Sequence, residues 1–380
     1  MKIVIAPDSF KGSASAKQVA EALARGWRKV FPNAELVTVP MADGGEGTME
    51  ALVDATGGKM QEVEVSDPLG RPLSACYGIL GDGKTAVVEV AAASGLPLLA
   101  PSERKPLQTT TYGTGQLIRA ALKEGVERLL IGLGGSATVD GGAGLVSALG
   151  ARLLDADGQP IGPGGGSLGS LAQIQLGELP KLIEGVEVLA ACDVDNPLTG
   201  PNGAAAVFGP QKGAAPQDVQ VLDQNLAHYA QIISKELQVE VANLPGAGAA
   251  GGLGAGLVAF LGAKLIPGIQ MVIEASKLED KLEGCDLVIT GEGKLDGQSA
   301  GGKTPVGVAK LAEKHNIPVL AVGGSIAEDA DVLYQHGIGA MLSIAPGPIS
   351  LEKAIADGEK LLEEAGQRAA KLFALAGWRD

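Results

Sequence analysis

KIVIAPDSFKGSASAKQVAEALARGWRKVF, residues 2–31, begins with a short apolar run and passes through a polar loop into an amphipathic helical pattern. ELVTVPMADGGEGTMEALVDATG, residues 35–57, repeats this order. The two stretches predict strand, helix, strand and helix, with Ser15 as the cap of the first helix. Open α/β sheets bind ligands at the loops that follow their strands. The loops PDSFKGS and MADGGEGT are therefore candidate ligand loops.

The same alternation returns after residue 285 and predicts three further strands, beginning with a strand that ends at Thr290. A long helix over 350–377 is predicted to close the chain. Two βα units cannot cover a sheet, whereas five parallel strands can carry helices on both faces. Between these parts, short alternating runs over 61–90 predict an antiparallel meander.

We therefore predict an α/β fold with a doubly wound, Rossmann-like or flavodoxin-like parallel-sheet domain that is discontinuous in sequence. This domain comprises residues 1–62 plus 285–380, and an inserted mixed α/β domain comprises residues 63–284. Ligand sites favour the space between two such lobes, so we predict an active-site cleft between the two domains.

The charge and the cysteines limit the class of partner. A net charge of −14 argues against nucleic acid or an anionic membrane, because like charges repel. Cys76, Cys192 and Cys285 lie far apart without CxxC spacing, and the three histidines lack metal-ligand spacing. We expect no signal peptide and no membrane helix. We expect a cytoplasmic protein, monomeric or homodimeric, that acts on a small molecule.

The glycine-rich stretch GLGGSATVDGGAGL, residues 132–145, has three interpretations. It is a loop for phosphate, to which Ser136 and Thr138 can donate hydrogen bonds and where Asp140 could hold a metal. Alternatively, GLGGSA with Asp155 further on resembles a dinucleotide fingerprint, although the segment between them is short for its helix. The third interpretation is a structural turn between a buried strand and a buried helix.

Two segments match the GxxxxGK[ST] pattern of phosphate-binding loops. The first, at 78–85, lies between strand-like runs and is predicted to be a hairpin turn. The second, at 297–304, precedes a helix, but GEGKLD separates it from its predicted strand and Pro305 follows it at once. It therefore does not fit a standard phosphate-binding loop. Lys303 at this helix start still favours an anion.

Acidic and basic side chains follow several apolar runs. The acids are Asp8, Asp43, Glu46, Asp193, Glu292 and Asp296, and the lysines are Lys11, Lys212, Lys294 and Lys303. A single aspartate in such a loop is most often a turn former or a helix cap. Several of these loops in one chain favour convergence, and carboxylates with lysines suit Mg²⁺ and phosphate.

Motifs along the whole chain resemble those of one family. They include APDSFKGSASA, VPMADGGEGT, IGLGGSATVDGGAG, ACDVDNPLTGPNGAAAVFGPQKGA and VITGEGKLDGQSAGGKTPVGVA. With these motifs the chain resembles the bacterial glycerate kinases of the type that includes the glycerate 2-kinases, with departures at Phe10 and Gly12. The resemblance implies ATP-dependent phosphorylation of D-glycerate with Mg²⁺, and a two-domain α/β fold with a cleft. It favours ADP and 2-phosphoglycerate as products over 3-phosphoglycerate.

Phosphoryl transfer needs positioning, charge neutralisation and a base, which suggests roles for these residues. We expect ATP to be held by Gly134, Gly135, Ser136, Thr138, Lys212, Gly291 and Glu292. We expect the metal near Asp140, Asp193, Glu292 and Asp296, and glycerate near Asp8, Lys11, Asp43, Glu46 and Arg71. Asp193, Lys11 and Lys303 are the candidate catalytic residues. An NAD-dependent oxidoreductase and a non-catalytic sugar-acid sensor are the alternative functions.

Overall fold

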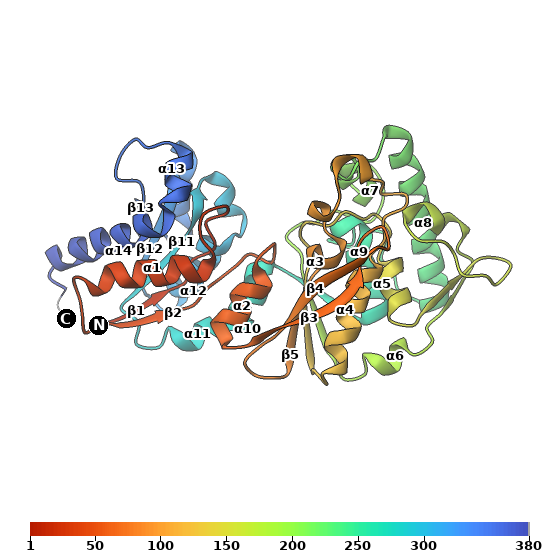
Figure 1. Cartoon of the computed structure of the whole chain (residues 1–380), viewed down its shortest axis with the longest axis horizontal. Coiled ribbons are helices and arrows are strands. Elements are labelled where there is room, and N and C mark those ends of the chain that lie inside the picture. Colours follow the sequence, from red (N-terminus) through yellow and green to blue (C-terminus); the bar gives the residue numbers. More distant parts are fainter. Residues whose placement is uncertain (379–380) are drawn as a thin grey trace. The chain divides into compact units, whose positions relative to one another are not determined.

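The computed structural model describes residues 1–378 and divides into two compact units (Figure 1). The first unit comprises Met1–Asp43, Glu50–Gly57 and the described chain from Ile269 onward. The second comprises Gly44–Met49 and Gly58–Gly268. These boundaries differ from the predicted ones at 62 and 284, and tertiary contacts explain the difference. Residues 59–66 form one strand of the second unit's sheet, whereas Lys281 donates a hydrogen bond to the Ala55 carbonyl within the first unit.

The first unit contains a five-stranded sheet in the order β13-β12-β11-β1-β2. All its neighbouring strands are parallel, which confirms the predicted doubly wound sheet. The strands are β1 (Lys2–Ile5), β2 (Glu35–Thr38), β11 (Leu287–Leu295), β12 (Val319–Ile326) and β13 (Ala340–Ser343). The central strands are buried because apolar side chains cover both of their faces.

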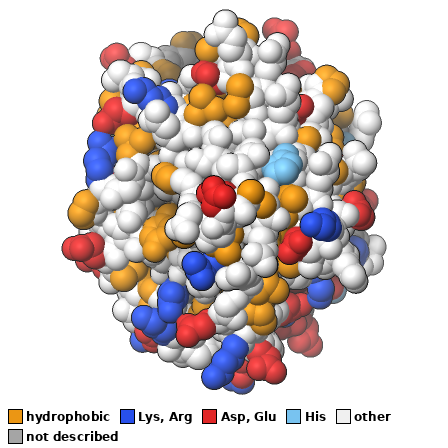
Figure 2. All heavy atoms as spheres, turned by 90° about the vertical axis from the view of Figure 1, so that its right-hand side faces the viewer, with side chains coloured by type: hydrophobic (Ala, Val, Ile, Leu, Met, Phe, Trp, Pro, Cys, Tyr) orange, Lys and Arg blue, Asp and Glu red, His pale blue; other side chains and the backbone are white. Residues whose placement is uncertain are grey.

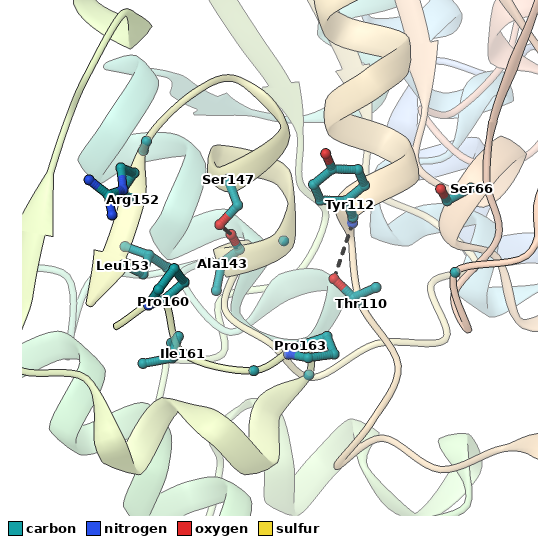
Figure 3. A pocket seen from close by; sticks show the side chains of 15 residues that line it. Ser66, Thr110, Tyr112, Ala143, Ser147, Arg152, Leu153, Pro160, Ile161 and Pro163 are labelled. Carbon is teal, nitrogen blue, oxygen red and sulfur yellow. Dashed lines mark hydrogen bonds between the residues drawn. The ribbon is translucent and has the colours of Figure 1, made fainter. Parts of the chain in front are cut away.

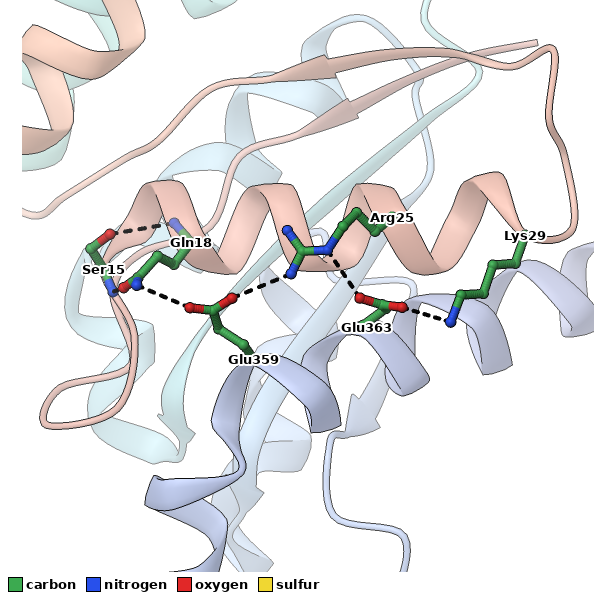
Figure 4. Close-up of polar contacts among 6 residues, drawn as sticks. All are labelled: Ser15, Gln18, Arg25, Lys29, Glu359 and Glu363. Atoms are coloured by element: carbon green, nitrogen blue, oxygen red, sulfur yellow. Dashed lines mark hydrogen bonds and ion pairs between the residues drawn. The ribbon is translucent and has the colours of Figure 1, made fainter.

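Helices α1 (Ala16–Arg28) and α14 (Gly358–Leu375) pack together on one face of this sheet. Figure 4 shows the polar contacts between them, in which Arg25 of α1 and Lys29, the residue after α1, pair with Glu359 and Glu363 of α14. Ser15 caps α1 through a reciprocal bond pair with Gln18, which confirms the predicted cap (Figure 4). Exposed ion pairs contribute little, so the buried side chains between the helices hold this layer.

The remaining segments of the first unit complete its layers. Right-handed crossovers place α12 on the face opposite α1, because β12 and β2 lie on opposite sides of the central pair. Helices α12 and α10 approach each other closely, since a Cβ on Gly307 would lie 2.2 Å from the Ile269 side chain. These segments are α2 (Thr48–Thr56), α10 (Gly268–Ser276), α11 (Leu278–Lys281), η5 (Gly297–Gly301), α12 (Thr304–Lys314), η6 (Glu328–His336) and α13 (Leu351–Ala356).

Two predicted elements of the first unit are wrong in their bounds. The strand predicted to end at Thr290 continues to Leu295, because residues 291–295 extend the pairing with β12. The predicted long terminal helix is broken at Asp357 into α13 and α14. The Ser13 hydroxyl donates to the Ile355 carbonyl, and a Cβ on Gly358 would lie 2.0 Å from that hydroxyl. A contact from the start of the chain therefore occupies the break.

The second unit contains a six-stranded mixed sheet in the order β10-β9-β6-β5-β4-β3. The strands are β3 (Lys59–Ser66), β4 (Pro72–Ile79), β5 (Thr85–Glu89), β6 (Arg128–Gly132), β9 (Glu187–Ala191) and β10 (Lys264–Ile266). Strands β3, β4 and β5 are antiparallel neighbours, as predicted, and the strands from β5 to β10 are parallel. Residues 80–84 connect β4 to β5, so the first GxxxxGK[ST] match is a hairpin connection.

The dinucleotide interpretation of residues 132–145 is wrong. That fingerprint requires the strand carrying its acidic residue to lie parallel beside the first strand. Strand β7 (Arg152–Leu154), which precedes Asp155, pairs antiparallel with β8 (Gln173–Gln175) in a separate sheet. The neighbours of β6 are instead β5 and β9.

The helical segments of the second unit surround its large apolar core. They are α3 (Ala91–Ser94), η1 (Leu96–Leu98), η2 (Pro101–Glu103), α4 (Tyr112–Lys123), α5 (Ala143–Ala148), η3 (Gly165–Ser170), α6 (Leu179–Leu182), α7 (Ala204–Phe208), η4 (Pro210–Lys212), α8 (Pro216–Leu237) and α9 (Ala249–Leu261). On the face drawn in Figure 2, basic and acidic side chains lie interspersed. Within residues 1–378, none of the helices has the length and apolar character that crossing a membrane requires.

Candidate functional site

A charged pocket of about 480 Å³ lies at the carboxyl ends of β1 and β11. The connections from these neighbouring strands leave in opposite directions, which makes this edge the switch point where open α/β sheets bind ligands. The polar side chains that line the pocket are Asp8, Ser9, Lys11, Asp43, Glu292, Lys294, Asp296, Gln298 and Lys303. The structure thus brings together seven of the acidic and basic residues that were predicted to converge: Asp8, Lys11, Asp43, Glu292, Lys294, Asp296 and Lys303.

Asp8 is fixed in this pocket by both neighbouring strands. Its backbone N–H donates to the Gly291 carbonyl of β11 over 2.8 Å. Its Oδ1 accepts from the Ser9 N–H, and its Oδ2 accepts from the Thr304 hydroxyl over 2.7 Å. Burial raises the pKa of the Asp8 carboxyl, the Thr304 hydrogen bond opposes this, and the nearby Asp43 adds to the increase.

Glu292 is the second carboxyl in the pocket with a raised pKa. Burial is the largest cause of the increase, which hydrogen bonding from Ser299 and the charge of Lys303 oppose. The Lys303 ammonium lies 3.6 Å from Glu292 Oε2. Next to it, Lys294 lies 3.0 Å from Asp296 and lowers the pKa of that carboxyl. Two carboxyls with raised pKa beside lysines are typical of a site that binds an anion and moves a proton.

The oxygen donors of this pocket suit Mg²⁺, but they do not form a complete cage. Among residues 1–378, the structure has no group of three or more histidine, cysteine or acidic side chains that could hold a metal ion. Mg²⁺ in phosphoryl-transfer enzymes is commonly bound by one or two carboxylates together with substrate phosphates and water. The pocket chemistry therefore fits Mg²⁺ that is bound jointly with a nucleotide.

The glycine-rich loop that follows β6 rests on a buried lysine in the second unit. Gly134 and Gly135 are exposed, whereas Ser136 and Thr138 are buried. Lys212 is 2% exposed, and its Nζ donates to Ser136 Oγ over 2.8 Å and to the Thr138 carbonyl over 2.7 Å. Burial lowers the pKa of Lys212 to about 7, and the charge of Asp140 opposes that decrease. The sequence named Ser136 and Lys212 as separate candidates, and the structure shows that they are hydrogen-bonded to each other.

Asp140 is a buried hydrogen-bond acceptor beneath the same loop. Its carboxylate accepts from the N–H and hydroxyl of Thr111 and from the N–H groups of Gly142 and Gly144, over 2.8–3.2 Å. Its side chain is 1% exposed, and burial raises its pKa. These contacts join the loop to the start of α4. The predicted metal role of Asp140 remains a prediction.

Glu89 is a buried carboxyl near Glu46 that was not among the residues singled out from the sequence. It ends β5, is buried, and accepts a hydrogen bond from the Met49 N–H over 2.8 Å. It thereby fixes the chain that carries Glu46, and burial raises its pKa. The only sequence signal was an acidic residue near the end of the apolar run AVVEV, which also fits an exposed strand end.

The other predicted residues lie in the second unit. Asp193 follows β9 and accepts a hydrogen bond from the Gly268 N–H over 2.9 Å. Arg71 contacts Asp67 and Glu103 over 2.5 and 2.7 Å, so two carboxylates already engage its guanidinium. Glu46 belongs to the segment over the carboxyl ends of β6 and β9, where a Cβ on Gly44 would lie 2.6 Å from Ala191.

The fold and the candidate site define a two-unit α/β protein with a charged pocket at the switch point of one sheet and a glycine-rich loop over a buried lysine in the other unit. Comparison with known proteins gives the family. Residues 3–374 match the model of the glycerate kinase family, and the chain belongs to that family.

Similar proteins cover nearly the whole chain. A Bacillus subtilis (strain 168) protein named glycerate kinase is 53% identical over 376 residues, which are 99% of this chain and 98% of that protein. An Escherichia coli (strain K12) protein named glycerate 2-kinase is 53% identical over 354 residues, 93% of each chain. A solved structure from Salmonella typhimurium LT2, described as a glycerate kinase 2, has a TM-score of 0.92, 49% identity and 99% coverage of both chains. The family resemblance found from the motifs is confirmed.

Proposed function

We propose that this protein transfers the terminal phosphate of ATP to D-glycerate, giving ADP and 2-phosphoglycerate. The observation that carries the proposal is the pocket between β1 and β11, where Asp8 and Glu292 have raised pKa values next to Lys303. Glycerate has one carboxylate and two hydroxyls. Such a molecule needs a cation for its charge and a base for the hydroxyl that attacks phosphorus.

In the first unit, Lys11 and Lys303 would balance the glycerate carboxylate and the charge on the transferred phosphoryl group. Asp8 or Glu292 would accept the hydroxyl proton, and Asp43 would bind a hydroxyl. A raised carboxyl pKa supports this assignment, because a general base works best when its pKa lies near the operating pH. Mg²⁺, held with Glu292 and Asp296, would neutralise charge on the phosphates.

In the second unit, the exposed backbone of Gly134 and Gly135 and the Ser136 hydroxyl would hold ATP phosphates. Lys212 donates to the Ser136 oxygen, which leaves the Ser136 hydroxyl proton free to point to an anion. Roles of Glu46, Arg71 and Asp193 in substrate or metal binding remain predictions, as does the cleft between the domains. The cytoplasmic location and the monomeric or dimeric state also remain predictions from the sequence.

Incubation with ATP, Mg²⁺ and D-glycerate, followed by phosphorus NMR, tests the function and the position of the phosphate together. We expect a phosphomonoester signal that matches 2-phosphoglycerate, formed in step with ADP. A signal matching 3-phosphoglycerate would change the proposed position of the phosphate but would still support the proposed kinase activity. Absence of both esters in a folded preparation that binds glycerate would instead favour a sugar-acid sensor.

A further inference from the structure

The second unit has a pocket of about 470 Å³ for which the roles above provide no ligand. Apolar groups form most of its lining, among them Ala143, Leu153, Ile161, Pro163 and the ring of Tyr112 (Figure 3). Polar groups are few and include the hydroxyls of Thr110 and Ser147 and the side chain of Arg152. An apolar cavity of this size with few polar groups is typical of a site for a drug-sized organic ligand.

Tyr112 gives this pocket an aromatic wall. It is the first residue of α4, its side chain is 40% exposed, and its N–H donates to the Thr110 hydroxyl over 3.3 Å. Figure 3 shows the Tyr112 ring beside Ala143 and Ser147 of α5, with Pro163 on another side. An exposed aromatic ring at the rim of an apolar pocket provides a surface on which a planar base can stack.

The pocket wall is attached to the glycine-rich loop by short connections. The Thr109 hydroxyl donates to the Ala137 carbonyl over 2.9 Å, and Thr110, the next residue, lines the pocket. One hydrogen bond and two peptide bonds thus separate Ser136 from the pocket wall. Asp140 makes a second connection, because it accepts from the N–H of Gly144, another lining residue. The pocket and the loop are parts of one buried hydrogen-bonded framework.

We propose that this pocket holds the purine base of ATP while the loop at Gly134, Gly135 and Ser136 holds the phosphates. The inference rests on the proposed use of ATP and adds the location of the base. A purine is planar and largely apolar on its faces, so it gains from Tyr112 and the aliphatic walls. The pocket at Asp8 cannot supply such a surface, because carboxylates and lysines line it.

Photolabelling of the whole protein with 8-azido-ATP locates the base directly. We expect cross-links in the peptides that contain Tyr112 or residues 143–164, and we expect excess ATP to suppress them. Cross-links confined to peptides outside the pocket lining, or no ATP-suppressible label, would overturn the proposal.

Two variants, one that removes a pocket side chain and one that fills the cavity, test the pocket through the affinity of the protein for ATP. Tyr112→Ala removes the aromatic wall, and Ser147→Phe fills the cavity from α5. Each should weaken ATP binding at least about fivefold, because stacking on an aromatic side chain contributes about 1–3 kcal/mol per base. The affinity for inorganic triphosphate, which has no base, should stay unchanged. Equal weakening of both ligands, or of neither, would contradict a base pocket.

Matched controls separate this effect from general damage. Tyr334→Ala removes another exposed tyrosine, and Val221→Phe enlarges an exposed side chain of α8; neither residue lines the pocket. Both should leave the ratio of the two affinities unchanged. The phosphorus NMR assay of the unmodified protein tests the proposed reaction on its own. If ATP-suppressible labelling of the pocket is found but no phosphoglycerate is formed, the proposed reaction is rejected while the proposed base site is supported.

Discussion

Thr304 donates a hydrogen bond of 2.7 Å to Asp8, joining residues that lie 296 positions apart in the chain. Thr304 begins α12, whereas Asp8 follows β1 at the opposite end of the sequence. The bond lowers the pKa of Asp8, although burial keeps that pKa above its ordinary value. It therefore both positions the carboxylate and adjusts its basicity.

Removing this hydroxyl should shift the pH dependence of the reaction. In Thr304→Val the hydrogen bond that favours the carboxylate is lost, so the pKa of Asp8 rises further. If Asp8 is the base, the acidic limb of the kcat/KM profile moves to higher pH, because this limb reports the free enzyme. Thr304→Ser keeps the hydroxyl and should restore the limb. An unmoved limb in Thr304→Val would show that Asp8 does not control the rate.

Glu292→Gln should lower kcat by about 100-fold or more while the protein stays folded. The amide keeps the shape of the side chain but can neither take a proton nor balance Lys303. Initial rates with saturating ATP and glycerate measure the effect. The exposed Glu283, also in the first unit, provides a matched control as Glu283→Gln. A loss of less than about threefold in Glu292→Gln would rule out an essential role.

Much of the fold could be predicted from sequence, because each strand of the parallel sheet is a short apolar run with a helical pattern after it. KIVI and LVIT carry this signal without help from the rest of the chain. The break at Asp357 could not be predicted, because Ser13, which bonds Ile355, belongs to a distant segment. The predicted boundary at residue 284 differs from the one in the structure for the same reason, because Lys281 donates a hydrogen bond to Ala55, which lies 226 positions away in the chain.

The candidate site was predicted in part. Asp8 and Glu292 were named because each follows a predicted strand, and the carboxyl ends of parallel strands share one edge of the sheet. Glu89 was missed because burial, which distinguishes it from an exposed strand end, depends on the segment around Met49. Likewise, the sequence placed Lys212 among the lysines of the site without showing that it supports Ser136.

Lys212→Met should change how stability depends on pH. Burial lowers the pKa of Lys212 to about 7 from an ordinary value of 10.5, and the charge of the nearby Asp140 opposes that decrease. Between these values the unfolded chain binds more protons, so the unfolding free energy of the wild type rises with pH. Relative to the variant, the unfolding free energy of the wild type should increase by at most about 1.4 kcal/mol per pH unit above pH 7.

Urea unfolding at pH 6 and pH 9 measures this difference. The unfolding free energy of the variant, relative to that of the wild type, should be highest at pH 6, because the buried ammonium of the wild type is charged in the folded state at that pH. Lys181→Met, on the exposed side of α6, should show the same difference from wild type at both pH values. A pH-independent difference for Lys212→Met would contradict the lowered pKa.

Gly26→Ala should destabilise the protein by separating α1 from α14. A Cβ at position 26 would lie 1.9 Å from the Glu363 carbonyl oxygen and 2.7 Å from the Gln367 nitrogen, and backbone atoms cannot rotate away. Overpacking of this kind costs about 1–3 kcal/mol, which outweighs the gain of about 1 kcal/mol in helix propensity. Gly347→Ala meets no atom within 4 Å and should leave stability nearly unchanged. Denaturant midpoints compare the two, and a Gly26→Ala variant as stable as the wild type would mean that the helices do not pack at this distance.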